Sequence, residues 1–436
     1  MQTSQLLETM FSSENLNRAL KQVKSNNGCA GIDRLSISAT IEKLKQGDNG
    51  NKFRQSLLNG TYQPQPVLGV EMPKAKGGVR QLGIPTVQDR IVQQAISNVL
   101  TDIYEPKFSN SSYGFRPRRS AHHALAQGSK FIRSGLGYVV DIDLEKYFDT
   151  VNHDRLMNRL SRDIEDKRVL KLIRHYLQSD LMRGGIAELR QKGTPQGGPL
   201  SPLLSNIVLD ELDKELESRG HKFCRYADDC QIYVSSEVAA KRVLLSISCF
   251  LEGKLKLKVN QEKSKATRVC ERSFLGHYFK QSGEVRITRD AYRRMKIRVR
   301  KLPKRNQAKS LPVVIKELNQ YLRGWQSYYK LALFGDRMKR LDSWIRRRLR
   351  CYKLKQRKRK FSIAVWLIKS GLTTRDAWNL AKSDKGWWKL SRTPQLHQAL
   401  PDKQLAGLGL YSLQGGYEAL KIYSKPPYAT HACTVV

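Results

Sequence analysis

Two pairs of aspartates have the residue type and spacing that could do chemistry. Asp228 and Asp229 are adjacent inside the strand-like run FCRYADDCQIYV, residues 223–234. Because neighbouring residues of a strand point to opposite faces, both acids can serve one site only from the tip of a hairpin. An Asp-Asp hairpin tip by itself is most often a solvated turn, so this pair needs a second acidic segment to indicate a site.

The segment YVVDIDLEKYFD supplies that second set of acids. Asp141 and Asp143 are two positions apart and share one face at the end of an apolar run that is typical of a buried strand. Buried carboxylates need a basic residue or a metal ion as partner. If the two strands lie side by side, their oxygens could bind Mg²⁺, with Mn²⁺ as a substitute. Two such ions would align an attacking hydroxyl with a leaving pyrophosphate, which is the chemistry of nucleotidyl transfer.

Two glycine-containing segments fit the same chemistry. EMPKAKGGVRQLGIP places Lys74 and Arg80 on either side of Gly77-Gly78, which predicts a hairpin whose basic residues could hold a triphosphate. GTPQGGPLSPLLSN, residues 193–206, predicts a loop that runs into a helix and allows close approach of a base or phosphate. Either segment alone is more often an ordinary turn.

Helices and strands that could position these residues are visible in the pattern. Thr86 and Asp89 resemble a capping box before apolar residues at helical spacing in 92–103, and a second amphipathic helix is expected over about 202–217. Strand-like runs near residues 137, 222 and 273 alternate with helices without a βαβ rhythm. The sequence therefore predicts an α+β fold rather than a doubly wound parallel sheet.

The composition favours a polyanionic partner. The 436 residues include 79 Lys and Arg against 39 Asp and Glu, a net charge of +40, which favours nucleic acid through phosphate neutralisation. We find no apolar run long enough to span a membrane and no secretory signal, so we expect a cytoplasmic protein without membrane attachment. The seven cysteines form no CxxC pair, which indicates neither a disulfide framework nor a zinc site.

Positive charge is concentrated in one helical stretch. From Lys280 to Lys360, 28 Lys and Arg stand against 5 Asp and Glu, so this stretch contributes 28 − 5 = +23. Apolar residues within 314–329 and 341–349 form two helical stripes. Arg346, Arg347, Arg348 and Arg350 surround the second stripe, and we expect them to form a cationic face that contacts nucleic acid.

In their order along the chain, these segments resemble the motifs of group II intron-encoded reverse transcriptases, or maturases. The similar segments fall between about residues 25 and 350 and include GIDRLS, EMPKAKGGVRQLGIPTVQDRIVQQAI, SYGFRPRRSAHHAL, VVDIDLEKYFDTVNHDRL, GTPQGGPLSPLLSNIVLDELD, RYADD, LKLKVNQEKSK, FLGHYF and LNQYLRGWQSYYK. The resemblance implies a right-hand polymerase with fingers, a palm of antiparallel sheet and helices, a helical thumb and a small basic C-terminal domain. The expected boundaries are 1–60 for an N-terminal extension, 61–284 for fingers and palm, 285–365 for the thumb or maturase domain, and 366–436 for a DNA-binding-like domain.

The resemblance also implies roles at the acidic site. Asp143, the peptide carbonyl of Ile142 and Asp228 would hold two Mg²⁺ ions, and Asp229 would be the supporting carboxylate. Asp143 is preferred to Asp141 because the family pattern has an aromatic residue five positions later, here Phe148.

Further roles concern the incoming nucleotide. Phe148 would exclude a 2′-hydroxyl, so that the product is DNA. Lys74 and Arg80 would bind the triphosphate, and Gln196 would approach the nucleotide. Lys263 or Lys265 is a candidate proton donor to pyrophosphate, although a surface lysine is the simpler interpretation.

The implied function is RNA-dependent DNA synthesis from dNTPs and a DNA primer or target, with binding and splicing of a structured group II intron RNA and target-primed reverse transcription. Many family members end in an HNH-type endonuclease, and no paired cysteines and histidines follow Lys369, so we expect priming from an existing nick or a replication fork. Three alternatives stay open: an RNA-binding splicing cofactor without polymerase activity, a domesticated reverse transcriptase in defence or DNA repair, and an RNA-dependent RNA polymerase, which Phe148 disfavours.

Overall fold

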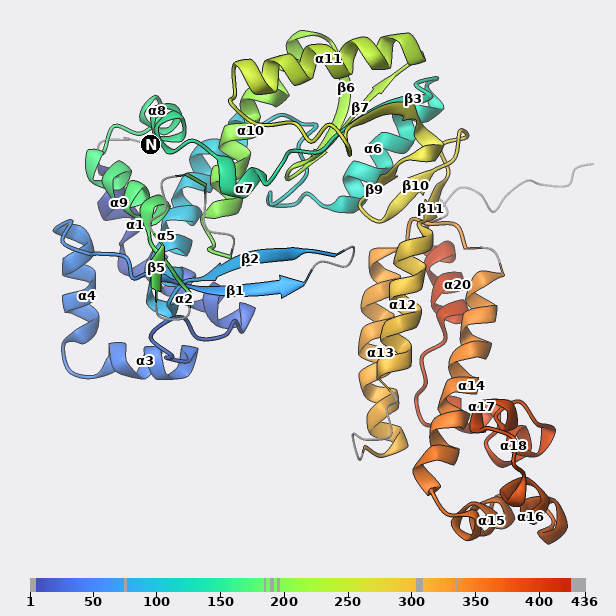
Figure 1. Cartoon of the computed structure of the whole chain (residues 1–436). Coiled ribbons are helices and arrows are strands. Elements are labelled where there is room, and N and C mark those ends of the chain that lie inside the picture. Colours follow the sequence, from blue (N-terminus) through green and yellow to red (C-terminus); the bar gives the residue numbers. More distant parts are fainter. Residues whose placement is uncertain are drawn as a thin grey trace, which may run out of the picture. The chain divides into compact units, whose positions relative to one another are not determined.

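The computed structural model describes residues 5–73, 77–183, 186–188, 192–193, 197–302, 309–334 and 336–424 (Figure 1). The chain divides into two compact units, Met1–Arg272 and Ser273–Val436. Each unit has its own hydrophobic core and is described by itself.

Mixed helices and strands build the first unit. Its helices are α1 Leu6–Met10, α2 Ser13–Asn26, α3 Ile37–Lys45, α4 Asn49–Leu58, α5 Val87–Tyr104, α6 Ala121–Arg133, α7 Tyr147–Thr150, α8 His153–Ser161, α9 Lys167–Gln178, α10 Ser201–Ser218 and α11 Glu237–Gly253. Its strands are β1 Val67–Pro73, β2 Val79–Ile84, β3 Tyr138–Ile142, β4 Leu181–Arg183, β5 Ile186–Glu188, β6 Lys222–Tyr226, β7 Asp229–Val234 and β8 Lys265–Arg268.

An antiparallel four-stranded sheet with the order β6-β7-β3-β8 carries the acidic segments. The predicted hairpin over residues 223–234 is confirmed, since β6 pairs with β7 and Tyr226 lies opposite Asp229. Strand β3 pairs with β7 so that Ile142 faces Cys230. Helices α6 and α11 pack against this sheet. The register therefore places the end of β3 beside the tip of the hairpin.

A second sheet has the order β2-β1-β4-β5. The hairpin predicted for EMPKAKGGVRQLGIP is confirmed by antiparallel pairing of β1 with β2, which is drawn as a long projecting ribbon in Figure 1. Gly77 and Gly78 have φ of +93° and +79°, a region that glycine adopts without steric penalty. Near the end of β2, Gly83 packs on Val67 and Leu181.

Thr86 caps the N-terminus of α5 as predicted, but among the described hydrogen bonds the reciprocal bond of a capping box, from the Thr86 N–H to the Asp89 carboxylate, is absent. The Thr86 hydroxyl accepts a hydrogen bond from the backbone N–H of Asp89 at 3.1 Å and donates one to its carboxylate at 2.6 Å. Such a cap satisfies a backbone donor that the first turn of α5 leaves unpaired. The helix expected over 202–217 is confirmed as α10.

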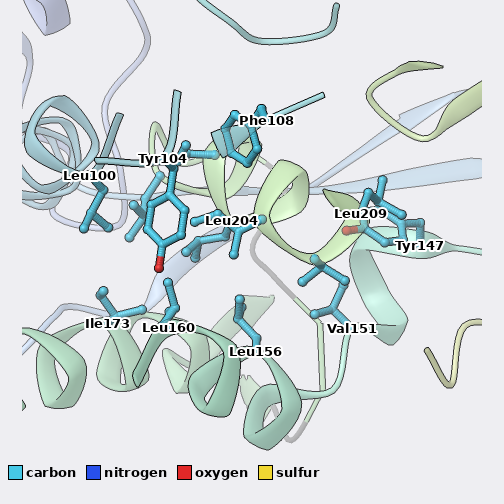
Figure 2. Packing of buried hydrophobic residues seen from close by; sticks show 14 of the residues in the cluster. Leu100, Tyr104, Phe108, Tyr147, Val151, Leu156, Leu160, Ile173, Leu204 and Leu209 are labelled. Carbon is cyan, nitrogen blue, oxygen red and sulfur yellow. The ribbon is translucent and has the colours of Figure 1, made fainter. Parts of the chain in front are cut away.

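The core of the first unit joins its N-terminal helices to the sheet and to α5. Leu6, Leu7, Met10 and Phe11 are buried in the same cluster as residues of α5, α8, α9, α10 and α11. Figure 2 shows Tyr104 and Leu204 facing Leu160 across this cluster. Residues 1–60, predicted as an extension, therefore share the core of the first unit through α1 and α2.

The second unit combines a small sheet with helices. Its elements are β9 Ser273–Phe274, β10 His277–Phe279, β11 Val285–Ile287, α12 Arg289–Lys301, α13 Leu311–Tyr328, α14 Arg337–Arg357, α15 Lys360–Lys369, α16 Thr374–Lys382, α17 Trp387–Leu390, α18 Pro394–Ala399, α19 Asp402–Gly407 and α20 Leu413–Ser424. The two predicted helical stripes are confirmed as buried faces of α13 and α14. A smaller cluster is formed by residues from α14 to α18. The predicted boundary after residue 365 falls within α15.

The predicted α+β class is confirmed by this mixture of antiparallel sheets and helices. Among the described residues, no helix combines the length and apolarity that crossing a membrane requires.

Candidate active site

The structure brings the acidic residues together as the strand pattern predicts. Asp228 lies in the two-residue turn between β6 and β7, and Asp229 is the first residue of β7. Asp143 directly follows β3, whose last residue, Ile142, is opposite Cys230. The three predicted catalytic aspartates thus come from the tip of one hairpin and the end of the neighbouring strand.

Desolvation and repulsion between acids perturb the two carboxylates of the hairpin. Desolvation, followed by repulsion from Asp228, Asp141 and Asp143, raises the pKa of Asp229 to about 7, although this residue keeps an open face to solvent. Desolvation also raises the pKa of Asp228; Arg80 opposes the shift and Asp143 adds to it. Among the described basic side chains, none forms an ion pair with Asp228 or Asp229. The hairpin tip therefore carries negative charge that no described ion pair neutralises.

Asp141 is placed differently from the other three acids. Its carboxylate forms an ion pair with Arg272, in which Nε lies 2.8 Å from Oδ2, and it accepts a hydrogen bond from Gln231 at 3.2 Å. Burial nevertheless raises the pKa of Asp141, because desolvation outweighs the effect of Arg272. Arg272 thus occupies the carboxylate of Asp141, whereas Asp143 has no arginine partner among the described residues.

The segment 260–264 holds the backbone of Asp143. The N–H of Asp143 donates to the hydroxyl of Ser264 at 3.0 Å, and its carbonyl accepts from the N–H of Asn260 at 2.9 Å. In the same segment, Nζ of Lys263 lies 3.5 Å from Oδ1 of Asp143. Lys263 rather than Lys265 therefore approaches the acidic site, since Lys265 lies in β8 opposite Asp141.

Phe148 lies on α7, four residues beyond Leu144, where it is half-buried. Its neighbour Tyr147 is fully buried and donates a hydrogen bond to the carbonyl of Ser205 at 3.0 Å. Figure 2 shows Tyr147 beside Leu209 of α10. The ring of Phe148 packs edge-on against Tyr147 with centroids 5.2 Å apart, so α10 fixes the place of Phe148.

The other predicted nucleotide contacts are only partly described. Arg80 is exposed on β2 and lies close enough to Asp228 to favour its ionised form. Lys74 and Gln196 lie outside the described residues. On either side of Gln196, Gly193 donates its N–H to the carbonyl of Val151 at 2.8 Å, and Gly197 approaches the carbonyl of Gly83. The described glycines of the loop therefore lie against the chain next to Phe148 and against β2.

These residues fit a divalent metal ion, although the described residues contain no group of three His, Cys, Asp or Glu side chains that could hold one. Mg²⁺ is commonly held by one or two carboxylates together with phosphate oxygens and water. Asp143 and Asp228 supply such a pair, and a bound cation would relieve the repulsion between them.

The arginines of α14 have partners inside the second unit. Arg350 is 2% exposed and donates to the carbonyl of Leu400 and the carboxylate of Asp402, so it does not belong to the exposed cationic face that the helical pattern predicted. Arg346 also pairs with Asp402, at 2.8 Å. The guanidinium groups of Arg347 and Arg348 lie over the ring of Trp388. Nucleic-acid contact by Arg346, Arg347 and Arg348 stays a prediction.

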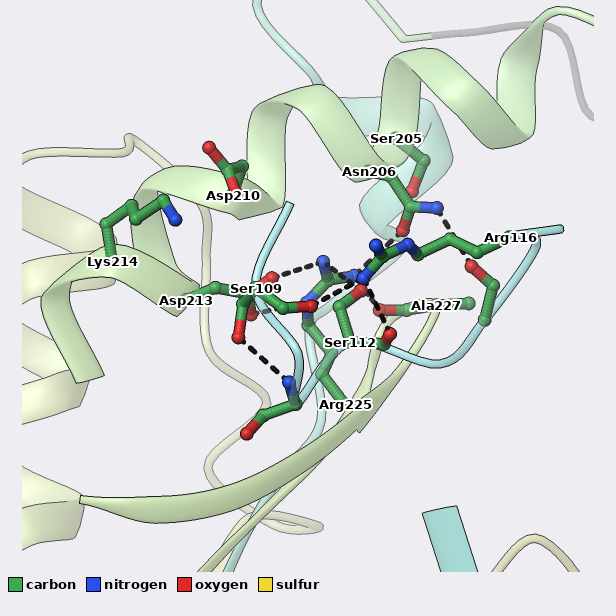
Figure 3. Close-up of polar contacts among 12 residues, drawn as sticks. Ser109, Ser112, Arg116, Ser205, Asn206, Asp210, Asp213, Lys214, Arg225 and Ala227 are labelled. Atoms are coloured by element: carbon green, nitrogen blue, oxygen red, sulfur yellow. Dashed lines mark hydrogen bonds and ion pairs between the residues drawn. The ribbon is translucent and has the colours of Figure 1, made fainter. Parts of the chain in front are cut away.

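Sequence reasoning missed one buried residue beside the acidic turn. Arg225, three residues before Asp228, is fully buried and forms an ion pair with Asp213 of α10 (Figure 3). The signal that could have found it is a charged residue within the apolar run of β6, because a buried charge requires a partner.

Two family models match the chain. Residues 72–279 match the family described as "Reverse transcriptase (RNA-dependent DNA polymerase)", and residues 292–369 match "Group II intron, maturase-specific domain". The chain is 33% identical over 320 residues to Protein YkfC of Escherichia coli (strain K12). This match covers 64% of this chain and 83% of YkfC. It is 37% identical over 211 residues to the group II intron-encoded protein LtrA of Lactococcus lactis subsp. cremoris, which covers 48% of this chain but only 34% of LtrA.

A solved structure of apo telomerase from Candida tropicalis, truncated from the C-terminal domain, is also similar. It has 15% sequence identity and a TM-score of 0.43, and the match covers 51% of this chain and 55% of the telomerase chain.

Proposed function

The chain belongs to the group II intron-encoded reverse transcriptases, a family of RNA-directed DNA polymerases, and from this premise we propose that it extends a primer 3′-hydroxyl with dNTPs on an RNA template. The observation that carries this proposal is the convergence of Asp143, Asp228 and Asp229 without an ion-pair partner for the hairpin carboxylates among the described residues. Repulsion between these carboxylates would not stabilise the turn, so a purely structural role does not account for their arrangement.

We propose separate tasks for the carboxylates. Asp143 and Asp228 would hold two divalent cations, to which the carbonyl of Ile142 would contribute an oxygen, while Asp229 adds negative charge beside them. When bound, the ions would activate the primer hydroxyl and neutralise charge on the triphosphate. Asp143 is suited to holding a cation because residues of segment 260–264 form hydrogen bonds with both its backbone N–H and its backbone carbonyl.

We propose that the surrounding residues bind the nucleotide. Arg80 and Lys74 would bind the triphosphate, and Gln196 would approach the nucleotide. Phe148, whose ring packs against Tyr147, would lie beneath the sugar and would exclude a 2′-hydroxyl. Lys263, whose Nζ lies 3.5 Å from Oδ1 of Asp143, would give a proton to the leaving pyrophosphate.

Primer extension on an RNA template tests this function. We would supply Mg²⁺ with dNTPs or NTPs separately and compare the wild type with Asp228→Asn. Asp154→Asn is the matched control, because Asp154 lies in α8 and its side chain is 82% exposed. DNA synthesis by the wild type and the control, but not by Asp228→Asn, is expected. Equal synthesis by all three proteins would refute the assigned role of the hairpin.

We propose splicing assistance and target-primed reverse transcription as further roles of the same chain, because a maturase-specific family segment matches residues 292–369. A cofactor without polymerase activity is the alternative that the basic second unit favours. It predicts tight, salt-sensitive binding of intron RNA with no primer extension by any variant. A catalytic intron core in the DNA flanking the gene would separate an intron-encoded role from one in defence or repair.

A further inference from the structure

The side chain of Arg225 is completely buried in the first unit, and every one of its hydrogen-bond donors is used. A guanidinium group has five N–H donors. Nε and Nη2 donate to the two carboxylate oxygens of Asp213 at 2.7 and 2.5 Å, and Nη2 also donates to the hydroxyl of Ser112 at 2.8 Å. Nη1 donates to the side-chain carbonyl of Asn206 and to the backbone carbonyl of Ala227, both at 3.0 Å.

One of these five acceptors belongs to the acidic turn itself. Ala227 precedes Asp228 and has a φ of +57°, in the left-handed region that disfavours residues with a Cβ atom. A turn with an alanine in this conformation is maintained only when its surroundings determine it. The bond from Arg225 to the carbonyl of Ala227 supplies such a restraint one residue away from Asp228.

The loop around residues 111–114 restrains the same turn from another side. The N–H of Arg225 donates to the carbonyl of Ser111 at 2.9 Å, and the N–H of Tyr113 donates to the carbonyl of Arg225 at 2.8 Å. Asn206 of α10 donates to the carbonyl of Gly114 at 2.8 Å, so one amide joins the loop to Arg225 (Figure 3). A Cβ atom on Gly114 would overlap the backbone nitrogen of Ala227.

Stability alone does not explain this arrangement. A buried ion pair such as that of Arg225 with Asp213 can often be replaced by apolar residues of similar volume without loss of stability. An apolar side chain could not reach the carbonyl of Ala227 with a donor, and lysine has only three donors without the planar fork. The planar group of five donors on Arg225 is therefore suited to binding the loop, α10 and the turn at the same time.

We propose that Arg225, assisted by Asn206, is a positioning residue that sets the place of Asp228 and Asp229 relative to Asp143. This inference rests on the proposed function, because it concerns how the same carboxylates are presented to a divalent cation and substrate. Arg225 touches neither: it acts through the backbone of Ala227. A displacement of the carboxylates by about 1 Å would then reduce turnover by about 100-fold.

Two variants disturb the turn in opposite ways. Asn206→Ala removes the amide that joins Gly114 to Arg225 and leaves the ion pair with Asp213 intact. Gly114→Ala removes no hydrogen bond but forces a methyl group against the turn. Gly253→Ala is the matched control, because a Cβ atom at Gly253 would meet nothing within 4 Å. Ser112→Ala, which removes a single acceptor from Arg225, is a milder variant if either substitution prevents folding.

The first readout is Mn²⁺ binding to the purified full chain, measured by electron paramagnetic resonance alongside circular dichroism and thermal denaturation. We expect both variants to stay folded and their Kd for Mn²⁺ to rise at least about 10-fold. The second readout is primer extension, in which we expect kcat to fall by about 10- to 100-fold with the KM for primer–template within about 2-fold of wild type. Gly253→Ala should match the wild type in both.

Other outcomes distinguish failure of the positioning role of Arg225 from failure of the proposed polymerase activity. Folded variants with wild-type Mn²⁺ binding and turnover would overturn the positioning role. Losses of Mn²⁺ binding and turnover that are fully explained by a smaller fraction of folded protein would overturn it as well. If the wild type makes no DNA but the variants still bind Mn²⁺ more weakly, the polymerase proposal fails while the positioning of the carboxylates stands.

Discussion

The ion pair between Arg272 and Asp141 offers the sharpest test of how charge is divided at the acidic site. Arg272 donates to the carboxylate of Asp141 and, through Nη2, to the carbonyl of Lys263 at 2.8 Å. We consider Arg272→Gln, which removes the positive charge but keeps a polar side chain. Asp141 would then retain only Gln231 as a described hydrogen-bond donor.

The exposure of the two side chains bounds the energetic effect. The side chains of Asp141 and Arg272 are 17% and 24% exposed, so the pair is neither fully buried nor on the open surface. Exposed pairs contribute about 0.2–1 kcal/mol, whereas breaking a buried pair costs about 3–5 kcal/mol. We therefore expect Arg272→Gln to lower the free energy of unfolding by about 2 kcal/mol.

A double-mutant cycle isolates this interaction. Denaturation by urea would be measured for the wild type, Arg272→Gln, Asp141→Asn and the double variant. Because the neutral amide introduced by Asp141→Asn needs no positive partner, we expect the double variant to recover about 1–2 kcal/mol relative to the sum of the single effects. Arg219→Gln is a suitable control, since its pair with Glu215 lies at the end of α10 and is more exposed.

Additive single effects would refute the reasoning, because they would mean that Arg272 does not compensate Asp141. Activity gives an independent reading of the same cycle. In Arg272→Gln, the uncompensated Asp141 would add negative charge beside Asp143 and Asp229, so primer extension should need a lower Mg²⁺ concentration. The double variant should need more Mg²⁺ than Arg272→Gln.

Two further predictions concern the same unit. The pKa of Asp229 is raised to about 7 in the folded protein, against about 3.9 in an unfolded chain, so the stability that its protonated form contributes is present below about pH 4 and is lost as pH rises through 7. Without metal, Asp229→Asn should therefore raise the Tm more at pH 8 than at pH 5 in thermal denaturation. An equal gain at both pH values would contradict this. Gly193→Ala should lower kcat/KM for dNTPs at least about 10-fold, because φ is +86° and a Cβ atom would lie 2.7 Å from the carbonyl oxygen of Phe148, whereas Gly220→Ala, with φ of +72° and open space, controls for the backbone penalty alone.

Local patterns were sufficient for the elements that carry the acids. The N-cap at Thr86 and the hairpin over 223–234 depend on residues within a few positions of one another, and both are present. That the two acidic strands lie side by side was only a condition of the sequence argument, and the pairing of β3 with β7 meets that condition. The assignment of catalytic roles to Asp143, Asp228 and Asp229 stays a prediction.

Interactions between distant segments could not be predicted in this way. Arg225 meets Ser112 and Asp213, and neither spacing follows a helical or strand period. Arg350 was wrongly predicted to be exposed because it lies on a basic helix. It is buried and donates a hydrogen bond to Asp402, which lies 52 positions later in the chain. A helical pattern shows which residues share a face, but it cannot show which later segment will cover that face.

The pairing of charges explains how a strongly basic chain can keep an acidic centre. Of the acids near β3, β6 and α10, Asp141 and Asp213 are paired with Arg272 and Arg225, which belong to the scaffold. Asp228 and Asp229 lack such a partner among the described residues, and the described ion pairs of Asp143 are limited to the contact with Lys263 at 3.5 Å. If scaffold arginines had paired with these acids as well, a divalent cation would have to displace a buried side chain before it could bind. The scaffold pairs instead hold the neighbouring strands, so the unpaired carboxylates stay ready for a cation while the excess of Lys and Arg elsewhere attracts the nucleic acid.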